Sequence, residues 1–411
     1  MKTRTKRSIE ALAVLALALA ASGACALAQG SPVPATQSVA PQIEVLGSGV
    51  ATLDLGRARH SQAAGGQTSS SAIDLSDSSL VVGASQRLYK PGAVGSFVIG
   101  GEATDQTDTG SGNGLFLHQL YANYEDHHLS ATLGRTDTPT RFIDFPTLRG
   151  DDLVDFTNLP DPYSDDVNTD EPLYSNLASA TYTPNLRDFF GVHAQDLIHS
   201  AGDVSEGDGL DSFGVAYSHE APPGLESIQS VVRYDIGYER QQIGRAQGGS
   251  SNFIYGGGVL NLRPSPVNPI TLSLQDIYST GNTLRAFEDE TDSFRAAGNA
   301  AAVSLALLHA PFGRPSRQIA LTAGYKDYAR VHDASSYGFA LTGVQRLGDG
   351  FDVVAQYTYT HRDPALAAVT GGSVDHAIEI GFAFHFDSIF NNTIGPRRSL
   401  LNLQHQYIPQ R

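Results

Sequence analysis

Hydrophobic and polar residues alternate along most of this chain. The clearest runs cover residues 318–328, 351–362 and 376–386. In the first of them, Ile319, Leu321 and Tyr325 alternate with Ala320, Thr322 and Lys326, and in the last Ile378, Ile380, Phe382, Phe384 and Phe386 share one face. A period of two is typical of β-strands with one apolar face, and helical spacing fits none of these runs. Similar runs recur from Gln42 onward, so the sequence predicts an all-β protein.

The connections between the predicted strands differ in length. The short ones cover residues 90–92, 126–128, 264–268, 313–316 and 348–350, and the long polar ones cover 61–71, 104–113, 199–209, 240–251, 281–292 and 363–375. Short turns alternating with long loops are typical of membrane barrels, and we count about sixteen strands, an even number as expected. We therefore predict a transmembrane antiparallel β-barrel over residues 42–387. Because Trp is absent, its interfacial girdles must consist of Tyr and Phe.

The longest connection follows the strand-like run LSATLGR and extends to about residue 175. A long segment inside a regular β array is usually functional. Its acidic residues outnumber its arginines: Asp144, Asp151, Asp152, Asp155, Asp161, Asp165, Asp166, Asp170 and Glu171 against Arg141 and Arg149. We interpret residues 140–175 as a constriction loop that folds back into the barrel and narrows its lumen.

The first 28 residues have the features of a cleaved signal peptide. Lys2, Arg4, Lys6 and Arg7 form a basic segment, an apolar segment follows at 11–21, and Ala26-Leu27-Ala28 is a cleavage motif. An uncleaved anchor helix and a lipoprotein signal ending at Cys25 are the alternatives. Residues 29–41, rich in Pro, Gln, Ala and Ser, are predicted to be a flexible lead-in.

Composition narrows the possible functions. Removing the signal takes away four basic residues and Glu10, so the formal charge moves from -16 to -19. This acidity argues against nucleic acid as a partner. The mature chain would also lack cysteine, since Cys25 is the only one, and would therefore have no disulfide or thiolate ligand. We predict no metal site, because Asp161 to Glu171 does not match a twelve-residue calcium loop, and no cofactor.

Several segments resemble the general trimeric porins of the Gram-negative outer membrane. SSLVVGASQRL (78–88) with PGAVGSFVIGGEAT (91–104) is similar to the second and third strands of that family, and LHQLYANYED (117–126) with LSATLGRTDTP (129–139) to the fourth and fifth. FPTLRGDDLVDF (145–156) is similar to the constriction loop of the family. The resemblance covers the mature chain loosely and is specific from about residue 78 to 160.

The resemblance implies a homotrimer in outer-membrane lipid that lets small hydrophilic solutes and ions diffuse passively through a water-filled channel. It also implies a site. The pore constriction would consist of Asp151, Asp152, Asp155, Asp144 and Arg149 in the loop and Arg135 on the facing wall. Ser79 and Asn176 occupy two other positions where the family has basic residues. We therefore expect the channel to prefer cations.

The sequence leaves three questions open. A solute-specific channel competes with a general one. An outer-membrane barrel enzyme, which would need a Ser-His or Asp-His constellation, and a secreted β binding protein are further alternatives; we predict that the chain is not an enzyme. Finally, residues 388–411 are either a tail beyond a barrel that closes at Phe386, or they contain the closing strand, with Leu401, Leu403 and Tyr407 on one face.

Overall fold

The fold comes from a computed structural model of the 411-residue chain. The structure describes residues 37–38, 42–60, 67–70, 73–74, 79–89, 96–106, 115–126, 128–135, 143, 145, 176–185, 187–196, 212–222, 225–243, 249–281, 298–310, 316–328, 334–348, 351–370 and 372–390. Side chains are described only from Ile99 onward. The predicted signal peptide and lead-in lie almost entirely outside the described residues.

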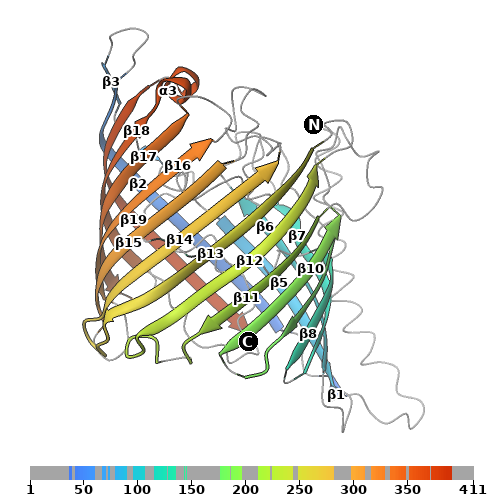
Figure 1. The fold of residues 1–411 in the computed structure, drawn as a ribbon. Coiled ribbons are helices and arrows are strands. Elements are labelled where there is room, and N and C mark those ends of the chain that lie inside the picture. Colours follow the sequence, from blue (N-terminus) through green and yellow to red (C-terminus); the bar gives the residue numbers. More distant parts are fainter. Residues whose placement is uncertain are drawn as a thin grey trace, which may run out of the picture.

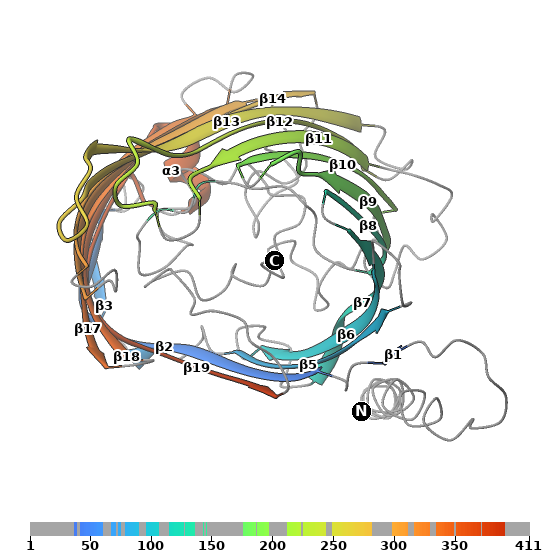
Figure 2. The same cartoon turned by 90° about the horizontal axis from the view of Figure 1, so that it is seen from below.

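The described strands form one antiparallel sheet that closes on itself (Figures 1 and 2). The sheet has 19 strands, three of which, β1 (Gln37–Ser38), β3 (Gln67–Ser70) and β4 (Ile73–Asp74), are short pieces paired with β5 or β2. The other sixteen each pair with two neighbours and make a ring. They are β2 (Gln42–His60), β5 (Ser79–Tyr89), β6 (Ser96–Gln106), β7 (Leu115–Glu125), β8 (Leu129–Arg135), β9 (Asn176–Tyr182), β10 (Asp188–Asp196), β11 (Ser212–Glu220), β12 (Val231–Ile243), β13 (Gly249–Arg263), β14 (Ile270–Gly281), β15 (Gly298–His309), β16 (Arg317–Tyr328), β17 (Ser335–Gly348), β18 (Phe351–Arg362) and β19 (Val374–Phe390). The strand count among the described residues agrees with the prediction.

The first and last long strands close the ring. β19 pairs with β2 in an antiparallel ladder that runs from Val374 opposite His60 to Phe390 opposite Ile43. β2 pairs on its other side with β5, and from there the order follows the sequence. The ladder extends a few residues past Phe386, where the aromatic run ends. Residues 391–411 lie outside the described residues.

The two ends of the barrel differ as the sequence indicated. Figure 1 shows short turns at the lower end, such as the one between β13 and β14. At the upper end, β18 and β19 are joined by a connection that contains the short helix α3 (Pro364–Thr370), which the sequence did not reveal. The long loop predicted at 240–251 was wrong: β12 and β13 continue their ladder to Ile243 opposite Gly249. Among the described residues, no helix has the length and apolar character needed to cross a membrane.

The strands whose side chains are described have one apolar outward face and one inward face. On β16, Ile319, Leu321 and Tyr325 are exposed, whereas Ala320, Thr322 and Lys326 are buried. The same alternation holds along β15 and β18, and on β19 Ile378 and Phe382 are exposed beside the buried Glu379. The faces predicted from the sequence are therefore confirmed. Large apolar side chains facing outward are stable only in lipid, so this surface is the membrane-facing one.

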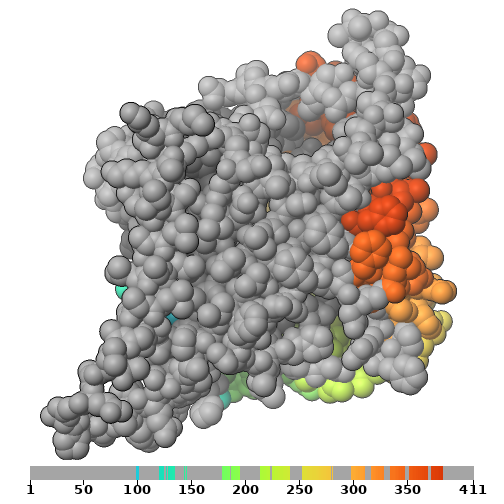
Figure 3. All heavy atoms as spheres, turned by 180° about the vertical axis from the view of Figure 1, so that it is seen from behind, coloured from blue at the N-terminus to red at the C-terminus, as the bar shows by residue number. Residues whose placement is uncertain are grey.

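Aromatic residues mark both edges of the outward apolar surface. Near the short turns, Tyr182, Phe190 and Tyr234 are exposed, and near the long connections Tyr278, Tyr325 and Tyr337 are exposed. These are the two interfacial girdles expected of a membrane barrel, built without Trp. Part of the outer surface of the later strands forms the orange and red edge of Figure 3.

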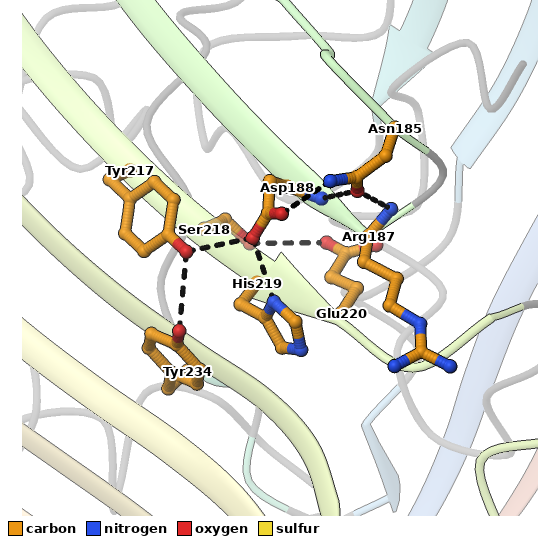
Figure 4. Close-up of polar contacts among 8 residues, drawn as sticks. All are labelled: Asn185, Arg187, Asp188, Tyr217, Ser218, His219, Glu220 and Tyr234. Atoms are coloured by element: carbon orange, nitrogen blue, oxygen red, sulfur yellow. Dashed lines mark hydrogen bonds and ion pairs between the residues drawn. The ribbon is translucent and has the colours of Figure 1, made fainter.

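A carboxylate lies among the aromatic rings of the lower girdle (Figure 4). Asp188 Oδ1 accepts a hydrogen bond from the Tyr217 hydroxyl (2.8 Å) and lies 2.8 Å from His219 Nδ1, and its Oδ2 accepts one from Asn185 Nδ2 (2.6 Å). The His219 and Tyr234 rings stack with centroids 5.0 Å apart. Because hydrogen bonds offset the cost of a charge near lipid, Asp188 is tolerated at the membrane edge.

Gly134 holds an unusual conformation at the end of β8, just before the longest connection. Its φ is 141°, and an added Cβ would collide with the Leu120 carbonyl oxygen and lie 2.7 Å from Tyr121 Cα. Both obstacles are backbone atoms, which cannot move without breaking the β7–β8 ladder. The glycine of the LGR run is therefore required by the backbone.

We predict that Gly134→Ala prevents most of the protein from assembling. A non-glycine residue in such a conformation costs about 1–3 kcal/mol, and the backbone collision adds to that cost. The measurement is the fraction of protein whose gel mobility changes on boiling. Gly343→Ala on β17 is the control, since its nearest atom would be 3.9 Å away. Equal folded fractions for the two variants would contradict this account.

Asp126 organises the turn between β7 and β8. Its Oδ1 accepts the backbone N–H groups of His128 (2.8 Å) and Leu129 (2.7 Å). These two hydrogen bonds, that from His128 first, hold the pKa of the Asp126 carboxyl below its usual value. The turn also contacts the next one along the ring, because Thr183 N–H donates to the His128 carbonyl (2.7 Å).

We expect Asp126→Ala to lower the temperature at which the unboiled species unfolds, since two backbone donors lose their acceptor. A lowered pKa stabilises the fold fully above the unfolded-state pKa of about 4, and this contribution is lost as pH falls through the folded-state value. Asp126→Asn keeps the acceptor but cannot titrate. At neutral pH it should therefore unfold near the wild-type temperature. On acidification to pH 3, its unfolding temperature should fall by less than that of the wild type. Identical pH profiles for wild type and Asp126→Asn would refute the assignment.

Candidate functional site

The inner faces of β15 to β18 are lined by small hydroxyl and amide side chains. Thr322 Oγ1 donates to Ser304 Oγ (2.9 Å), and Thr342 Oγ1 donates to Gln356 Oε1 (2.9 Å). These residues, like Thr358 and Thr360, are buried on the inward rows of their strands. A polar inner face opposite an apolar outer face is the arrangement of a barrel with an aqueous interior.

Charged side chains of both signs lie on the described inner wall. The acidic ones are Glu220, Asp235, Glu239, Asp352, Asp375 and Glu379, and the basic ones are Arg233, Lys326, Arg346 and Arg362. Three arginines face carboxylates: Arg233 Nε lies 2.7 Å from Asp235, Arg346 Nε 3.4 Å from Asp352 and Arg362 Nη1 3.9 Å from Asp375. The described wall is thus nearly balanced in charge and does not by itself select one sign of ion.

Glycines let large side chains lie flat on this wall. His193 on β10 and Glu239 on β12 are both opposite Gly214 of β11 in the register. A Cβ at Gly214 would overlap the His193 ring, whose Nε2 reaches Glu239 Oε1 at 3.0 Å. Tyr255 lies in the same way over Gly237. Because Tyr255 and Phe253 are only 3% and 6% exposed, their rings are not available for stacking against a solute.

The connection between β8 and β9 contacts the inner wall at Ile143. Its backbone N–H donates to Gln275 Oε1 on β14 (2.8 Å), and its Cγ1 lies 2.6 Å from the place of a Cβ at Gly257 on β13. Gln275 is on the buried face of β14, whereas Leu274 and Tyr278 are on the other, exposed face of the same strand. Ile143 is only 5% exposed. β13 and β14 are several strands away from β8 around the ring. Ile143 therefore lies inside the barrel, against the inner faces of β13 and β14.

Most residues predicted for the constriction lie outside the described residues. These are Asp144, Arg149, Asp151, Asp152 and Asp155. Only the backbone of Arg135 is described, and it pairs with Leu120 of β7 and Asn176 of β9. Alternate residues of a strand lie on the same face, so position 135 is on the same face of β8 as Leu129 and Leu133. Both leucines are exposed on the outer surface. The described structure neither brings these six residues together nor separates them.

Ile143, Gln275 and Gly257 are the site residues that sequence reasoning missed. Gln275 and Ile143 are 132 residues apart, and nothing local connects them. One signal was present: Gly256, Gly257 and Gly258 follow one another in the middle of a strand. Glycine inside a strand often marks a close approach of another backbone, and Gly257 does so here.

Several solved structures share this architecture. An anion-selective porin from Comamonas acidovorans matches 86% of this chain and 100% of its own at 13% identity, with a TM-score of 0.51. OmpT of Vibrio cholerae in its trimer form matches 85% and 100% at 11% identity and 0.52, and OmpF of Salmonella typhi in complex with daunomycin matches 84% and 97% at 12% identity and 0.51. The fold is that of the outer-membrane porins.

The comparisons of sequence found no relatives of this chain. No protein-family model matches the chain, and no curated protein matches it either. At identities of 11–13%, the similar structures show the fold alone. Among the residues that the structure describes, no group of three or more His, Cys, Asp or Glu side chains is arranged to hold a metal ion.

Proposed function

We propose that this chain forms a water-filled porin channel for passive diffusion of small hydrophilic solutes across the outer membrane, with a preference for cations. The observation that carries the proposal is the Ile143 contact, which brings the start of the acidic connection onto the inner wall. Eight strands fill a barrel with side chains, whereas about sixteen leave an aqueous channel. The polar inner face is consistent with such a channel.

The cation preference rests on the connection rather than on the wall. Residues 140–175 carry nine acidic residues and two arginines, whereas the described wall is nearly balanced. Carboxylates at a narrow point lower the energy of a passing cation and raise that of an anion. The porin fold itself does not decide the sign, since the similar Comamonas protein is described as anion-selective. We propose Asp151, Asp152 and Asp155, with Asp144 and Arg149, as the constriction residues.

An enzymatic role has little support in the described residues. Two Asp-His pairs lie near the ends of the described strands. Asp188 with His219 has two tyrosine hydroxyls beside it (Figure 4), and His361 lies 4.0 Å from Asp363, to which the Ser335 hydroxyl donates. Ser218, the neighbour of His219 in sequence, is buried on the opposite face and donates to Glu220. A serine nucleophile must lie within hydrogen-bond reach of its histidine, which Ser218 does not. We infer that the chain acts as a channel and not as a hydrolase.

Location and assembly belong to the same proposal. A signal peptide over residues 1–28 would export the chain, and the outward apolar band with its girdles would hold it in outer-membrane lipid. We propose a homotrimer, the form in which the similar OmpT was described. The direct test is single-channel recording of the purified protein in a planar bilayer. Stable conductance steps are expected, and their absence from folded protein would refute the channel.

Changing Asp151, Asp152 and Asp155 together to Asn should shift the zero-current potential in asymmetric KCl towards zero without abolishing conductance. Two unit charges about 8 Å apart interact by roughly 2 kcal/mol at an effective dielectric constant of ~20, so even half of this changes relative permeability several-fold. The shift should be largest at low salt, where screening is weakest. An unchanged potential at low salt would show that these carboxylates do not line the constriction.

Arg135→Ala tests the basic side of the proposed constriction. If Arg135 faces the acids, its removal should increase the cation preference. Arg135 is tested separately from the loop carboxylates because position 135 is on the same face of β8 as Leu133, which faces outward. An unchanged potential in Arg135→Ala, together with a shift in the triple Asn variant, would assign selectivity to the loop carboxylates alone.

We also propose that β19 is the closing strand and that the residues after it are dispensable for the barrel. Removing residues 391–411 should leave assembly and conductance close to wild type. Removing residues 379–411 takes away most of the ladder between β19 and β2. It would leave backbone groups unsatisfied in lipid, at several kcal/mol each, so assembly should fail. Loss of assembly in the shorter deletion would place the closing strand in the tail.

A further inference from the structure

The contact between Ile143 and the inner wall involves three adjacent strands. Gly257 of β13 pairs in the register with Asp235 of β12 and with Gln275 of β14. Ile143 lies over Gly257, and its backbone N–H donates to Gln275. The site is thus a defined place on a continuous ladder rather than a contact with one mobile side chain.

Gln275 is oriented by a hydrogen bond to the neighbouring strand β13. Its Nε2 donates to the Gly256 carbonyl at 3.2 Å, which leaves Oε1 directed at the Ile143 N–H. The side chain is 4% exposed, so water cannot readily replace either partner. A buried donor that loses its acceptor is strongly disfavoured, which makes the amide of Gln275 specific for this backbone group.

Gly257 provides the space that the aliphatic part of Ile143 needs. A Cβ there would lie 2.6 Å from Ile143 Cγ1 and 2.8 Å from the Leu274 carbonyl oxygen. The Ile143 side chain would have to move away, and the overlap with the carbonyl oxygen would in addition strain the β13–β14 ladder. Any side chain at position 257 therefore competes directly with the docked connection.

We propose that Gln275 and Gly257 form a dock for Ile143 that fixes the start of the acidic connection to the inner wall, so that these two residues position the selectivity carboxylates without touching a solute. This inference rests on the proposed channel function. Asp144 is the next residue in the chain and is tethered within one peptide unit of the dock. Undocking frees the connection at its beginning, and both the width of the passage and the place of its charges then vary with time.

Two variants remove the dock in different ways. Gln275→Leu keeps the approximate size of the side chain but removes the acceptor, and Gly257→Ala fills the space under Ile143. Gln275→Leu should assemble, as judged by mobility before and after boiling, whereas Gly257→Ala should assemble in part, because its Cβ also overlaps the Leu274 carbonyl oxygen. The assembled fraction of each should show additional conductance levels, more current noise in the open state and at least a twofold lower permeability ratio for cations over anions. The matched control is Gly191→Ala on β10, a buried inward-facing glycine whose nearest neighbour would be 3.4 Å from the new Cβ. It should behave as wild type.

A disulfide tests the contact independently of conductance. The exported chain has no cysteine of its own if cleavage follows Ala28. A pair of cysteines replacing Ile143 and Gly257 should oxidise readily. The place of the Gly257 Cβ lies 2.6 Å from Ile143 Cγ1, and because Cγ1 is bonded directly to the Ile143 Cβ, the two Cβ atoms fall within reach of the separation of about 3.5–4.5 Å that a disulfide needs. The control pair replaces Ile143 and Leu274, which faces outward. It should remain reduced. The oxidised 143–257 pair should conduct with less open-state noise than its reduced form.

The outcomes separate this inference from the proposed function. Failure of the 143–257 pair to form a disulfide in an assembled barrel would overturn the dock even if the wild type conducts. Disulfide formation with wild-type selectivity and noise in Gln275→Leu and Gly257→Ala would overturn the positioning role and leave the channel intact. A folded wild type without conductance would refute the channel itself, whatever the cysteines do.

Discussion

The ladder between β19 and β2 is the constraint on which the rest of this structure depends. In the hydrocarbon layer no water is present to satisfy backbone N–H and C=O groups, so a sheet can span it only when every strand has a partner on each side. The pairing of Val374 to Phe390 with His60 to Ile43 meets this condition. Once the ring is closed, each strand has one face towards lipid and one towards the interior. The alternation of Ile319 and Leu321 with Ala320 and Thr322 follows directly from that division.

The same division explains why much of the fold could be predicted from the sequence. A period of two is a local property, so the runs that became β16, β18 and β19 identified both their strands and their faces. Connections were harder to predict. Residues 240–251 are rich in Gly, Ser and Gln, which suggested a loop, but cross-strand pairing up to Ile243 and Gly249 outweighed that local preference. The extension of β19 to Phe390 was missed for the same reason, since pairing with β2 determines where that strand ends. The helix α3 was missed although Asp363 and Pro364 before an Ala- and Leu-rich run are a local helix-start signal.

The site was less accessible to sequence reasoning. Composition identified the acidic connection, because an excess of Asp over 140–175 is visible without any structure. Its place of attachment was not visible. The acceptor for the Ile143 N–H is a side chain 132 residues later, and the space for the Ile143 side chain is an absent Cβ at Gly257. Neither partner carries an unusual charge or belongs to a motif. Only the three consecutive glycines in β13 marked the position, and a glycine alone does not say which segment approaches it.

A nearly balanced wall gives a few carboxylates in the lumen a large influence on selectivity. Where an arginine lies next to a carboxylate, as with Arg233 and Asp235 at 2.7 Å, the two fields largely cancel a few ångströms away. A single charge acts over a longer range, up to about 8 Å at physiological ionic strength. Any charged group that projects from the wall into a lumen is also nearer to a passing ion than a group on the wall. Ion preference can therefore change sign between barrels of one fold with few substitutions, which is consistent with an anion-selective porin among the similar structures. The position of the connection thus matters as much as its charge, and the described position is that of Ile143 on β13 and β14.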